Sequence, residues 1–252
     1  MLVIADVHAA FDDLARVVGM GEPVVILGDL LNFVDYRTGA GIATEVFGAE
    51  FAQAAMQFRR LGDFAGSRKM WREYSAGRED EVRARVGREI QSQYARMQEA
   101  LSGGTGFVTH GNVDVPALLR SHLPDGFRYL NGEVVEIDGV RLGMVGGGAK
   151  TGLNAAGEIG EEEMAAILED MGPVDVLGTH VPPSINALRR DVVTGRLEGG
   201  SDAVTGYLQR HQPAVHYFGD IHQPQATRWR VGRTVCVNVG YFRATKRAVR
   251  HG

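Results

Sequence analysis

Short apolar runs alternate with amphipathic segments along most of the chain. Apolar runs of four or five residues, bounded by glycine or polar residues, predict buried strands. These runs span residues 1–5, 24–27, 106–109, 175–179 and 214–218. Apolar residues at spacings of three and four predict helices over residues 9–18, 161–171 and 201–210. Strands that alternate with helices favour a parallel or mixed sheet with helices on its faces.

Two further pairs of strands are predicted as antiparallel hairpins. The first joins residues 133–137 to residues 140–145 through Asp138-Gly139, a strong signal for a two-residue turn. The second joins residues 226–231 to residues 234–239 through Gly232-Arg233. The hairpins add antiparallel strands to the βαβ order of the other strands.

The alternation of strands and helices stops between about residue 36 and residue 102. One apolar stripe joins Phe47, Phe51, Ala55 and Phe58, and a second runs from residue 82 to residue 101. We predict a single domain over residues 1–252 with a helical insertion or cap at about 36–102. The second stripe can pack within the chain or against another copy, so a homodimer through the insertion is one alternative.

Six arginines between positions 68 and 88 of the insertion alternate with acidic residues. This pattern is typical of a solvated helix face with ion pairs. The alternative is a lid that lends an arginine to a phosphate group. We expect the pocket walls, and therefore the specificity, to come from residues 32–41, the insertion and residues 184–200.

Composition and charge exclude several classes of protein. A hydrophobic content of 44% and a charged content of 23% are ordinary for a globular protein. The net charge of −4 gives no signal for nucleic-acid binding, and the single Cys236 excludes an intramolecular disulfide. No apolar run reaches membrane-spanning length, and the first strand begins at Met1, so we expect neither a membrane anchor nor a signal peptide. A cytoplasmic protein is therefore expected.

Residues with metal-binding side chains follow five of the predicted strands. They are Asp6, His8, Asp29, Asn112, His180, Asp220 and His222, with His110 close by. Burying an unpaired carboxylate is costly, and open α/β sheets bind ligands at the carboxyl ends of their strands. Each residue alone can be explained by turn chemistry or a structural histidine. Together, these nitrogen and oxygen ligands suit Mn, Fe, Zn or Ni.

In their order along the chain, these residues resemble the calcineurin-like metallophosphoesterase superfamily. The resemblance rests on Asp6-x-His8, Gly28-Asp29, Gly111-Asn112-x-Asp114, His180 and Gly219-Asp220-x-His222. It covers nearly the whole chain outside the insertion. It implies an α/β fold, a four-layer αββα sandwich with the helical insertion added, and two divalent metal ions.

The resemblance also implies a role for each residue. The first metal would be held by Asp6, His8, Asp29 and His222. The second would be held by Asp29 as a bridge, by Asn112 and His180, and by Asp220 where the family usually has a histidine. Asp29, Asn112 and His180 would act in catalysis, in which a hydroxide that bridges the metals attacks phosphorus in line.

Two departures from the family pattern affect the expected substrate. With Asp220 in place of a neutral imidazole, three aspartates and the hydroxide cancel the charge of two divalent metals. Such a centre attracts a dianionic monoester less and favours Mn or Fe over Zn or Ni. The alternative is that Asp220 does not complete the second site, which then binds its metal weakly. Val113 stands where many members carry the histidine that helps to protonate the leaving group, and it cannot transfer protons. His110 either substitutes for that histidine in catalysis or is a structural residue.

We therefore predict a metal-dependent phosphoesterase, with phosphodiesters as the leading substrate class. A phosphomonoesterase or a nucleotide pyrophosphohydrolase is the alternative of the same class. A phosphoesterase-like scaffold that only binds partners is the alternative of another class. The expected partner is a small phosphorylated substrate, nucleotides included.

Overall fold

Two β-sheets packed face to face form the centre of the molecule. The computed structural model describes residues 1–35, 37–151 and 154–252. The first sheet has the strand order β13-β1-β2-β3-β4. It consists of β1 (Leu2–Ile4), β2 (Val24–Ile26), β3 (Gly106–Val108), β4 (Phe127–Tyr129) and β13 (Val249–Arg250). All its neighbours pair in parallel except β13, which is antiparallel to β1.

The second sheet has the order β11-β12-β10-β9-β6-β5. It consists of β5 (Val134–Ile137), β6 (Val140–Val145), β9 (Val176–Thr179), β10 (Val215–Phe218), β11 (Arg228–Val231) and β12 (Thr234–Asn238). Its middle strands are parallel, and the two predicted hairpins form its antiparallel edges. A short parallel pair, β7 (Gly148–Ala149) with β8 (Glu158–Ile159), lies outside both sheets.

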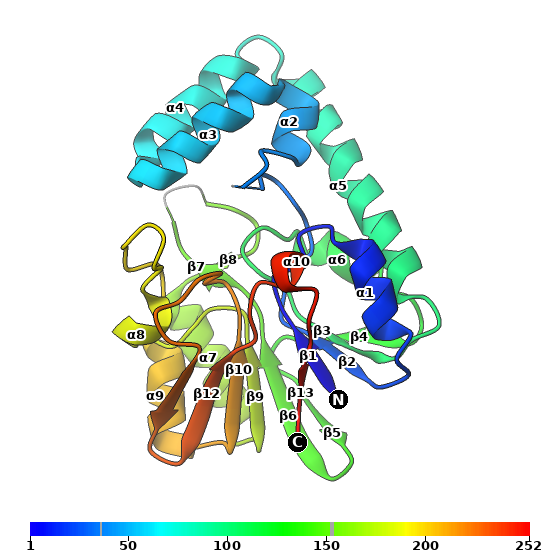
Figure 1. Ribbon diagram of the computed structural model, residues 1–252, viewed down its shortest axis with the longest axis vertical. Helices are drawn as coiled ribbons and strands as arrows, with labels where there is room; N and C mark the ends of the chain where they lie inside the picture. Colours follow the sequence, from blue (N-terminus) through cyan, green and yellow to red (C-terminus); the bar gives the residue numbers. More distant parts are fainter. Residues whose placement is uncertain (36, 152–153) are drawn as a thin grey trace.

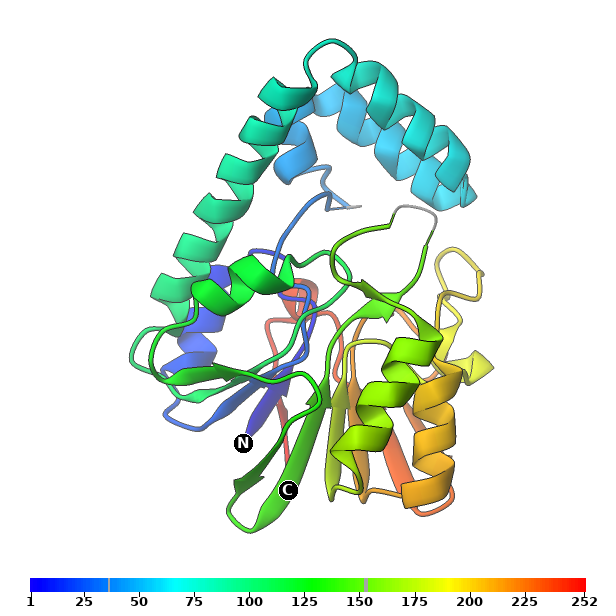
Figure 2. The ribbon, with the colours of Figure 1, turned by 180° about the vertical axis from the view of Figure 1, so that it is seen from behind.

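Helices cover the outer face of each sheet (Figures 1 and 2). The helices on the first sheet are α1 (Phe11–Val18), α5 (Glu79–Leu101) and α6 (Pro116–Ser121). The helices on the second sheet are α7 (Glu161–Met171) and α9 (Asp202–His211). Two single-turn helices, α8 (Asn186–Arg189) and α10 (Phe242–Thr245), lie in loops.

The alternation of side chains along each strand produces the layers. Leu2 and Ile4 on β1 pack against the helices of the first sheet, whereas Val3 and Ala5 point between the sheets. On β10, Phe218 packs toward α7 and α9, and its neighbour Tyr217 points between the sheets. Each sheet therefore buries both of its faces, and the predicted αββα sandwich is confirmed.

The residues between β2 and β3 form the helical insertion. It contains α2 (Ile42–Phe47), α3 (Ala49–Leu61), α4 (Phe64–Ser75) and α5, while Tyr36 lies outside the described residues. Gly48, with φ +90°, separates α2 from α3, so the first predicted stripe is divided between two helices. The first three helices build a small core around Phe51 and stand apart from the sandwich, to which α5 connects them (Figure 1).

The apolar stripe of α5 packs inside the chain. Ile90, Tyr94, Met97 and Leu101 are buried against α1 and the first sheet. The homodimer through the insertion stays a prediction. Among the described residues, no helix is both long enough and apolar enough to cross a membrane.

The sequence analysis missed the shortest elements. The strands β4 and β13, at the edges of the first sheet, have three and two residues, and an arginine in each leaves no continuous apolar run. Pairing of β13 with β1 brings the last residues of the chain beside the first, with Leu2 opposite Arg250. The strand β13 therefore covers the edge of β1, the strand that leads to Asp6.

Candidate metal centre

The carboxyl ends of strands from both sheets meet at one edge of the sandwich, on the side of the insertion (Figure 1). The loops after β1, β2, β3, β9 and β10 carry the seven predicted metal ligands there: Asp6, His8, Asp29, Asn112, His180, Asp220 and His222. Each has a side-chain nitrogen or oxygen within 3.1–4.0 Å of one from another member. The structure thus brings all seven together, whereas their metal-binding roles stay predictions.

One group of ligand atoms is formed by Asp6, His8 and His222. His222 Nε2 lies 3.3 Å from His8 Nε2 and 3.5 Å from Asp6 Oδ1. Two ligand atoms bonded to one tetrahedral cation at about 2.1 Å lie about 3.4 Å apart. The spacing of this group therefore fits a common cation.

A second group is formed by Asp6, Asp29 and His180. His180 Nε2 lies 3.5 Å from Asp29 Oδ1 and 3.1 Å from Asn112 Oδ1. Asp220 Oδ1 approaches the same nitrogen at 3.8 Å. Asp220 is therefore on the side of the second group, as the sequence predicted, at a slightly longer distance than the others.

Asp29 faces both groups. Its Oδ2 lies 3.6 Å from His8 Nε2, and its Oδ1 lies 3.5 Å from His180 Nε2. This is the placement expected of a bridging carboxylate. Asp6 also belongs to both groups, which the sequence analysis did not anticipate.

Two of the histidines are oriented by backbone carbonyls. His8 Nδ1 donates to Leu31 O at 2.9 Å, and His180 Nδ1 donates to Leu27 O at 2.8 Å. This bond places a proton on Nδ1 and directs Nε2 into the centre, an arrangement common for metal-binding histidines.

The electrostatics of the centre favour cations. Burial lowers the pKa of His180, but the carboxylates of Asp29 and Asp220 outweigh burial and raise this pKa to about 9. Burial raises the pKa of Asp29, because a charged carboxylate is poorly solvated there. The carboxylates thus draw positive charge into the centre, and a metal ion that binds would displace the proton from His180 Nε2.

Asp6 supplies a direct test of whether the residues fit a metal. Its Oδ2 accepts a hydrogen bond from Asp220 N at 3.1 Å. Its Oδ1 is buried and has no hydrogen-bond partner among the described residues. An unpaired buried carboxylate oxygen is costly, and a cation between Asp6, His8 and His222 would satisfy it. The donor set therefore fits divalent metal ions.

Asp114, which the sequence analysis quoted only as part of a motif, organises the loops of the centre. It is buried, and its carboxylate accepts hydrogen bonds from Leu30 N, Leu31 N and Gly111 N at 2.9–3.2 Å. It thereby joins the loop that carries Asp29 to the loop that carries Asn112. Tyr94 of α5 adds a hydroxyl at 3.4 Å, so the insertion also contacts this junction.

His110 lies beside the centre, but its side chain bonds to Tyr129 rather than to a predicted ligand. Its Nδ1 bonds to the Tyr129 hydroxyl at 2.8 Å, and burial lowers its pKa to about 4. Val113 donates its backbone N–H to Asp29 Oδ1 at 3.1 Å, while its side chain packs against the core between the first sheet and its helices. The contacts of His110 among the described residues are those of a structural histidine, and its catalytic role stays a prediction.

Arg59 of α3, a residue without a sequence signal, joins the insertion to the segment after α8. Arg59 Nη2 lies 3.2 Å from Glu198 Oε2, and Arg196 Nη1 donates to Arg59 O at 3.3 Å. Burial raises the pKa of Asp220, and the positive charges of His180 and Arg59 counteract this rise. The positive charge of Arg59 at the end of α3 therefore helps to limit the rise in the pKa of Asp220.

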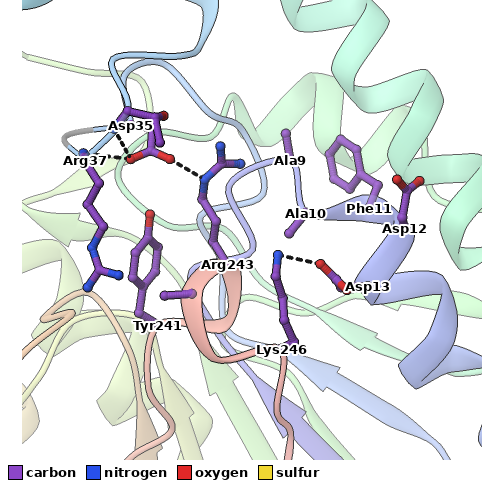
Figure 3. Close-up of a pocket in the computed structure, with 12 residues that line it drawn as sticks. Ala9, Ala10, Phe11, Asp12, Asp13, Asp35, Arg37, Tyr241, Arg243 and Lys246 are labelled. Atoms are coloured by element: carbon purple, nitrogen blue, oxygen red, sulfur yellow. Dashed lines mark hydrogen bonds and ion pairs between the residues drawn. The ribbon is translucent and has the colours of Figure 1, made fainter.

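A second neighbour that the sequence analysis missed is the segment after β12. A cavity of about 440 Å³ lies between this segment, the start of α1 and the loop after β2 (Figure 3). Its charged lining residues are Asp12, Asp13, Asp35, Arg37, Arg243 and Lys246. Opposite charges pair within this lining, Arg243 with Asp35 and Lys246 with Asp13, so the cavity has little excess charge.

The family model of the calcineurin-like phosphoesterases matches residues 1–224 of this chain. The match includes all seven predicted ligands and the insertion. No curated protein matches the chain significantly.

Two solved structures share the fold. One crystal structure has a TM-score of 0.60 at 19% sequence identity, over 96% of this chain and 90% of the other. The crystal structure of TT1561 of Thermus thermophilus has a TM-score of 0.52 at 12% identity, over 96% of this chain and 89% of the other. At these identities the likeness shows the fold alone.

Proposed function

Because the chain belongs to the calcineurin-like phosphoesterase family, we propose that it hydrolyses phosphodiesters at a centre of two divalent metal ions. Family membership and the two groups of ligand atoms support metal-dependent hydrolysis of a phosphoester. The observation that carries the proposal is the position of Asp29, whose two oxygens face His8 and His180. One carboxylate between two sets of ligands is what a pair of neighbouring metals requires.

The chain's own residues have distinct parts in this proposal. Asp6, His8 and His222 would hold one metal, Asn112, His180 and Asp220 would hold the other, and Asp29 would serve both. When bound, the metals supply a hydroxide nucleophile and stabilise negative charge on the phosphoryl oxygens. The carbonyl bonds of His8 and His180 keep both Nε2 atoms aimed at the centre. We propose Mn or Fe as the native metals and the cytoplasm as the location.

Three features support a diester as the substrate. Asp220 adds a third carboxylate, so the loaded centre has little net charge to attract a dianion. Arg59 places one positive charge nearby, which suits the single negative charge of a diester. Val113 cannot donate a proton to the leaving group, and His110 beside the centre is bonded through Nδ1 to the Tyr129 hydroxyl. Activated diesters therefore fit this site better than monoesters with poor leaving groups.

The test compares bis-p-nitrophenyl phosphate with p-nitrophenyl phosphate on Mn-loaded protein. We expect the diester to have the higher kcat/KM. We also expect Asp29→Asn to reduce kcat at least about 100-fold, because a bridging ligand supports several kcal/mol of transition-state stabilisation. The control His122→Ala removes a histidine that contacts Leu118 on α6, outside the centre, and should leave turnover unchanged.

Other outcomes would select the alternatives. Faster hydrolysis of the monoester would contradict the diester proposal and favour a phosphomonoesterase. Metal binding at two ions per chain without turnover of either ester would favour a scaffold that binds partners. The metal content of the purified protein is therefore measured on the same samples.

A further inference from the structure

We infer that Tyr241 is a positioning residue for the metal centre, which acts by holding the imidazole of His222. The inference rests on the metal binding in the proposed function. Tyr241 lies in the segment after β12, beyond the residues that the family model matches. The family pattern therefore assigns it nothing, and the argument depends on its contacts.

His222 differs from the other two histidines of the centre in how it is oriented. His8 and His180 are fixed by hydrogen bonds from Nδ1 to backbone carbonyls. Among the described residues, His222 has a hydrogen-bond contact only through Nε2. Its side chain is also 29% exposed, whereas that of His180 is fully buried. Something else must keep the His222 ring in one plane.

The ring of Tyr241 supplies that contact. It is stacked on the His222 imidazole with 3.8 Å between ring centres and only 3° between planes. The same ring meets His8 edge-on, with centres 5.7 Å apart. A flat ring against a flat ring limits rotation of the imidazole about its last side-chain bond. His222 Nε2 is thereby kept 3.5 Å from Asp6 Oδ1.

Tyr241 is itself held from several sides. It is buried, and its successors Phe242 and Arg243 donate backbone N–H groups to Ala5 O and Asp6 O at 3.1 Å each. The segment is therefore bonded to the backbone that carries the first ligand. This fixed support is what a positioning residue needs, because a mobile ring could not orient its neighbour.

Arg243 strengthens the same support (Figure 3). Its Nε donates to Asp35 Oδ2 at 2.7 Å, and its Nη1 donates to His8 O. The guanidinium carbon of Arg37 lies 5.3 Å from the Tyr241 ring centre. The C-terminal segment therefore joins the loops after β1 and β2 around the His222 side of the centre.

The test measures Mn²⁺ binding to the metal-depleted protein by calorimetry, without substrate. We expect Tyr241→Leu to weaken one of the two binding events by about 10–100-fold, the range typical when a partner that orients a metal ligand is lost. The other event should keep its affinity, because His180 has its own carbonyl bond. Tyr241→Phe retains the ring and should bind Mn²⁺ as the wild type does.

A matched control separates positioning from loss of packing. Tyr207 is another buried tyrosine beside a histidine, His211, with ring centres 4.6 Å apart, but both lie on α9 outside the centre. Tyr207→Leu should lower the Tm and leave Mn²⁺ affinity unchanged. If Tyr241→Leu fails to fold, Arg243→Lys is tested instead. Lysine keeps the positive charge but cannot donate to both Asp35 and His8 as the guanidinium does, so this variant should weaken the same Mn²⁺-binding event.

The outcomes are distinct. Unchanged Mn²⁺ affinity in folded Tyr241→Leu, or equal weakening of both events, would overturn the role of Tyr241 while leaving the metal centre in place. Equal weakening in Tyr241→Phe and Tyr241→Leu would also overturn it, because the ring would not matter. No Mn²⁺ binding to the wild type would overturn this inference together with the proposed function.

Discussion

Four of the polar residues at the strand ends have left-handed backbone conformations. Asp6, His8, Asp29 and Asp220 have φ between +41° and +66°. Such conformations cost about 1–3 kcal/mol for each residue other than glycine and persist only where the surrounding structure imposes them. Here the buried strands before them impose the direction of the chain. The strain turns four side chains toward one point, which a relaxed turn would not do.

Gly111 also depends on the surrounding structure, because its backbone lies very close to the ligand residues. A Cβ at this position would lie 2.1 Å from Asp29 Oδ1 and 2.7 Å from a ring carbon of His180. Only glycine lets the loop after β3 lie against both groups of ligands. The Gly-Asn pair that looked like turn chemistry in the sequence is thus explained by the space beside Asp29.

The lowered pKa of His216 should make the free energy of unfolding depend on pH. Its ring is buried on β10, and burial lowers its pKa to about 3. A histidine in the unfolded chain has a pKa near 6.5, so between about pH 6.5 and 3 the unfolded state binds a proton that the folded state does not. Stability should therefore fall as the pH drops below 6.5, by about 2 kcal/mol at pH 5 from this residue.

Urea unfolding of wild type and His216→Leu at pH 7 and pH 5 measures this effect. The variant should lose about 2 kcal/mol less than the wild type over this interval. His122→Ala should follow the wild type. Equal losses in the wild type and His216→Leu would show that acid acts through other groups.

At the scale of elements, the insertion contributes to the centre from both of its ends. Tyr94 of α5 accepts a hydrogen bond from Val115 N at 2.8 Å and contacts Asp114. At the other end, α3 contacts the loop after α8 through Arg59 and Arg196. That loop is bonded to the chain just after His222, because Val192 N donates to Gln223 O. The insertion is thus a cap connected to both sides of the site.

Substitution of Arg59 tests whether the insertion is part of the substrate-binding site. We expect Arg59→Ala to raise the inhibition constant of inorganic phosphate and the KM for esters by about 3–10-fold, since a charged hydrogen bond at a half-exposed site is worth about 1 kcal/mol. The neighbouring exposed Arg60→Ala is the matched control and should behave as the wild type. Glu198→Gln, which removes the negative charge beside the Arg59 guanidinium, should tighten phosphate binding. An Arg59→Ala variant with unchanged phosphate inhibition would assign the arginine to the cap's own structure.

At the scale of the whole molecule, metal binding should stabilise the fold. The ligands come from both sheets, with Asp6 and His222 at nearly opposite ends of the chain, so a bound ion acts as a cross-link. A ligand at 100 times its Kd adds about 2.7 kcal/mol, and about 2–4 °C per kcal/mol is expected for a chain of this size. Mn²⁺ should therefore raise the Tm of metal-depleted protein by about 5–10 °C.

Calorimetric scans with Mn²⁺ and with a chelator measure this rise. His180→Ala removes a ligand of the second group and should lose a large part of it. A Tm that is the same with Mn²⁺ and with chelator would contradict a metal centre built from both sheets.

The sequence by itself determined most of the elements, the family and the candidate ligands. The strands that carry Asp6, Asp29, His180 and Asp220 lie within a residue or two of their predicted positions, because buried strands next to glycine have a strong local pattern. The fold and the family were predicted from these motifs and are confirmed. The division of the first stripe at Gly48 was not predicted. The edge strands β4 and β13 were not predicted either, because Arg128 and Arg250 leave no continuous apolar run there.

Only the tertiary structure decided which side chains share the centre and how they are held. It placed Asp6 in both groups of ligand atoms, joined the loops that carry Asp29 and Asn112 through Asp114, and stacked Tyr241 on His222. These contacts join residues far apart in the chain. The packing of the two sheets and the pairing of β13 with β1 bring these residues together. Neither interaction produces a periodic pattern in the sequence. Local pattern therefore indicated the candidate ligands, and packing decided how their side chains are placed.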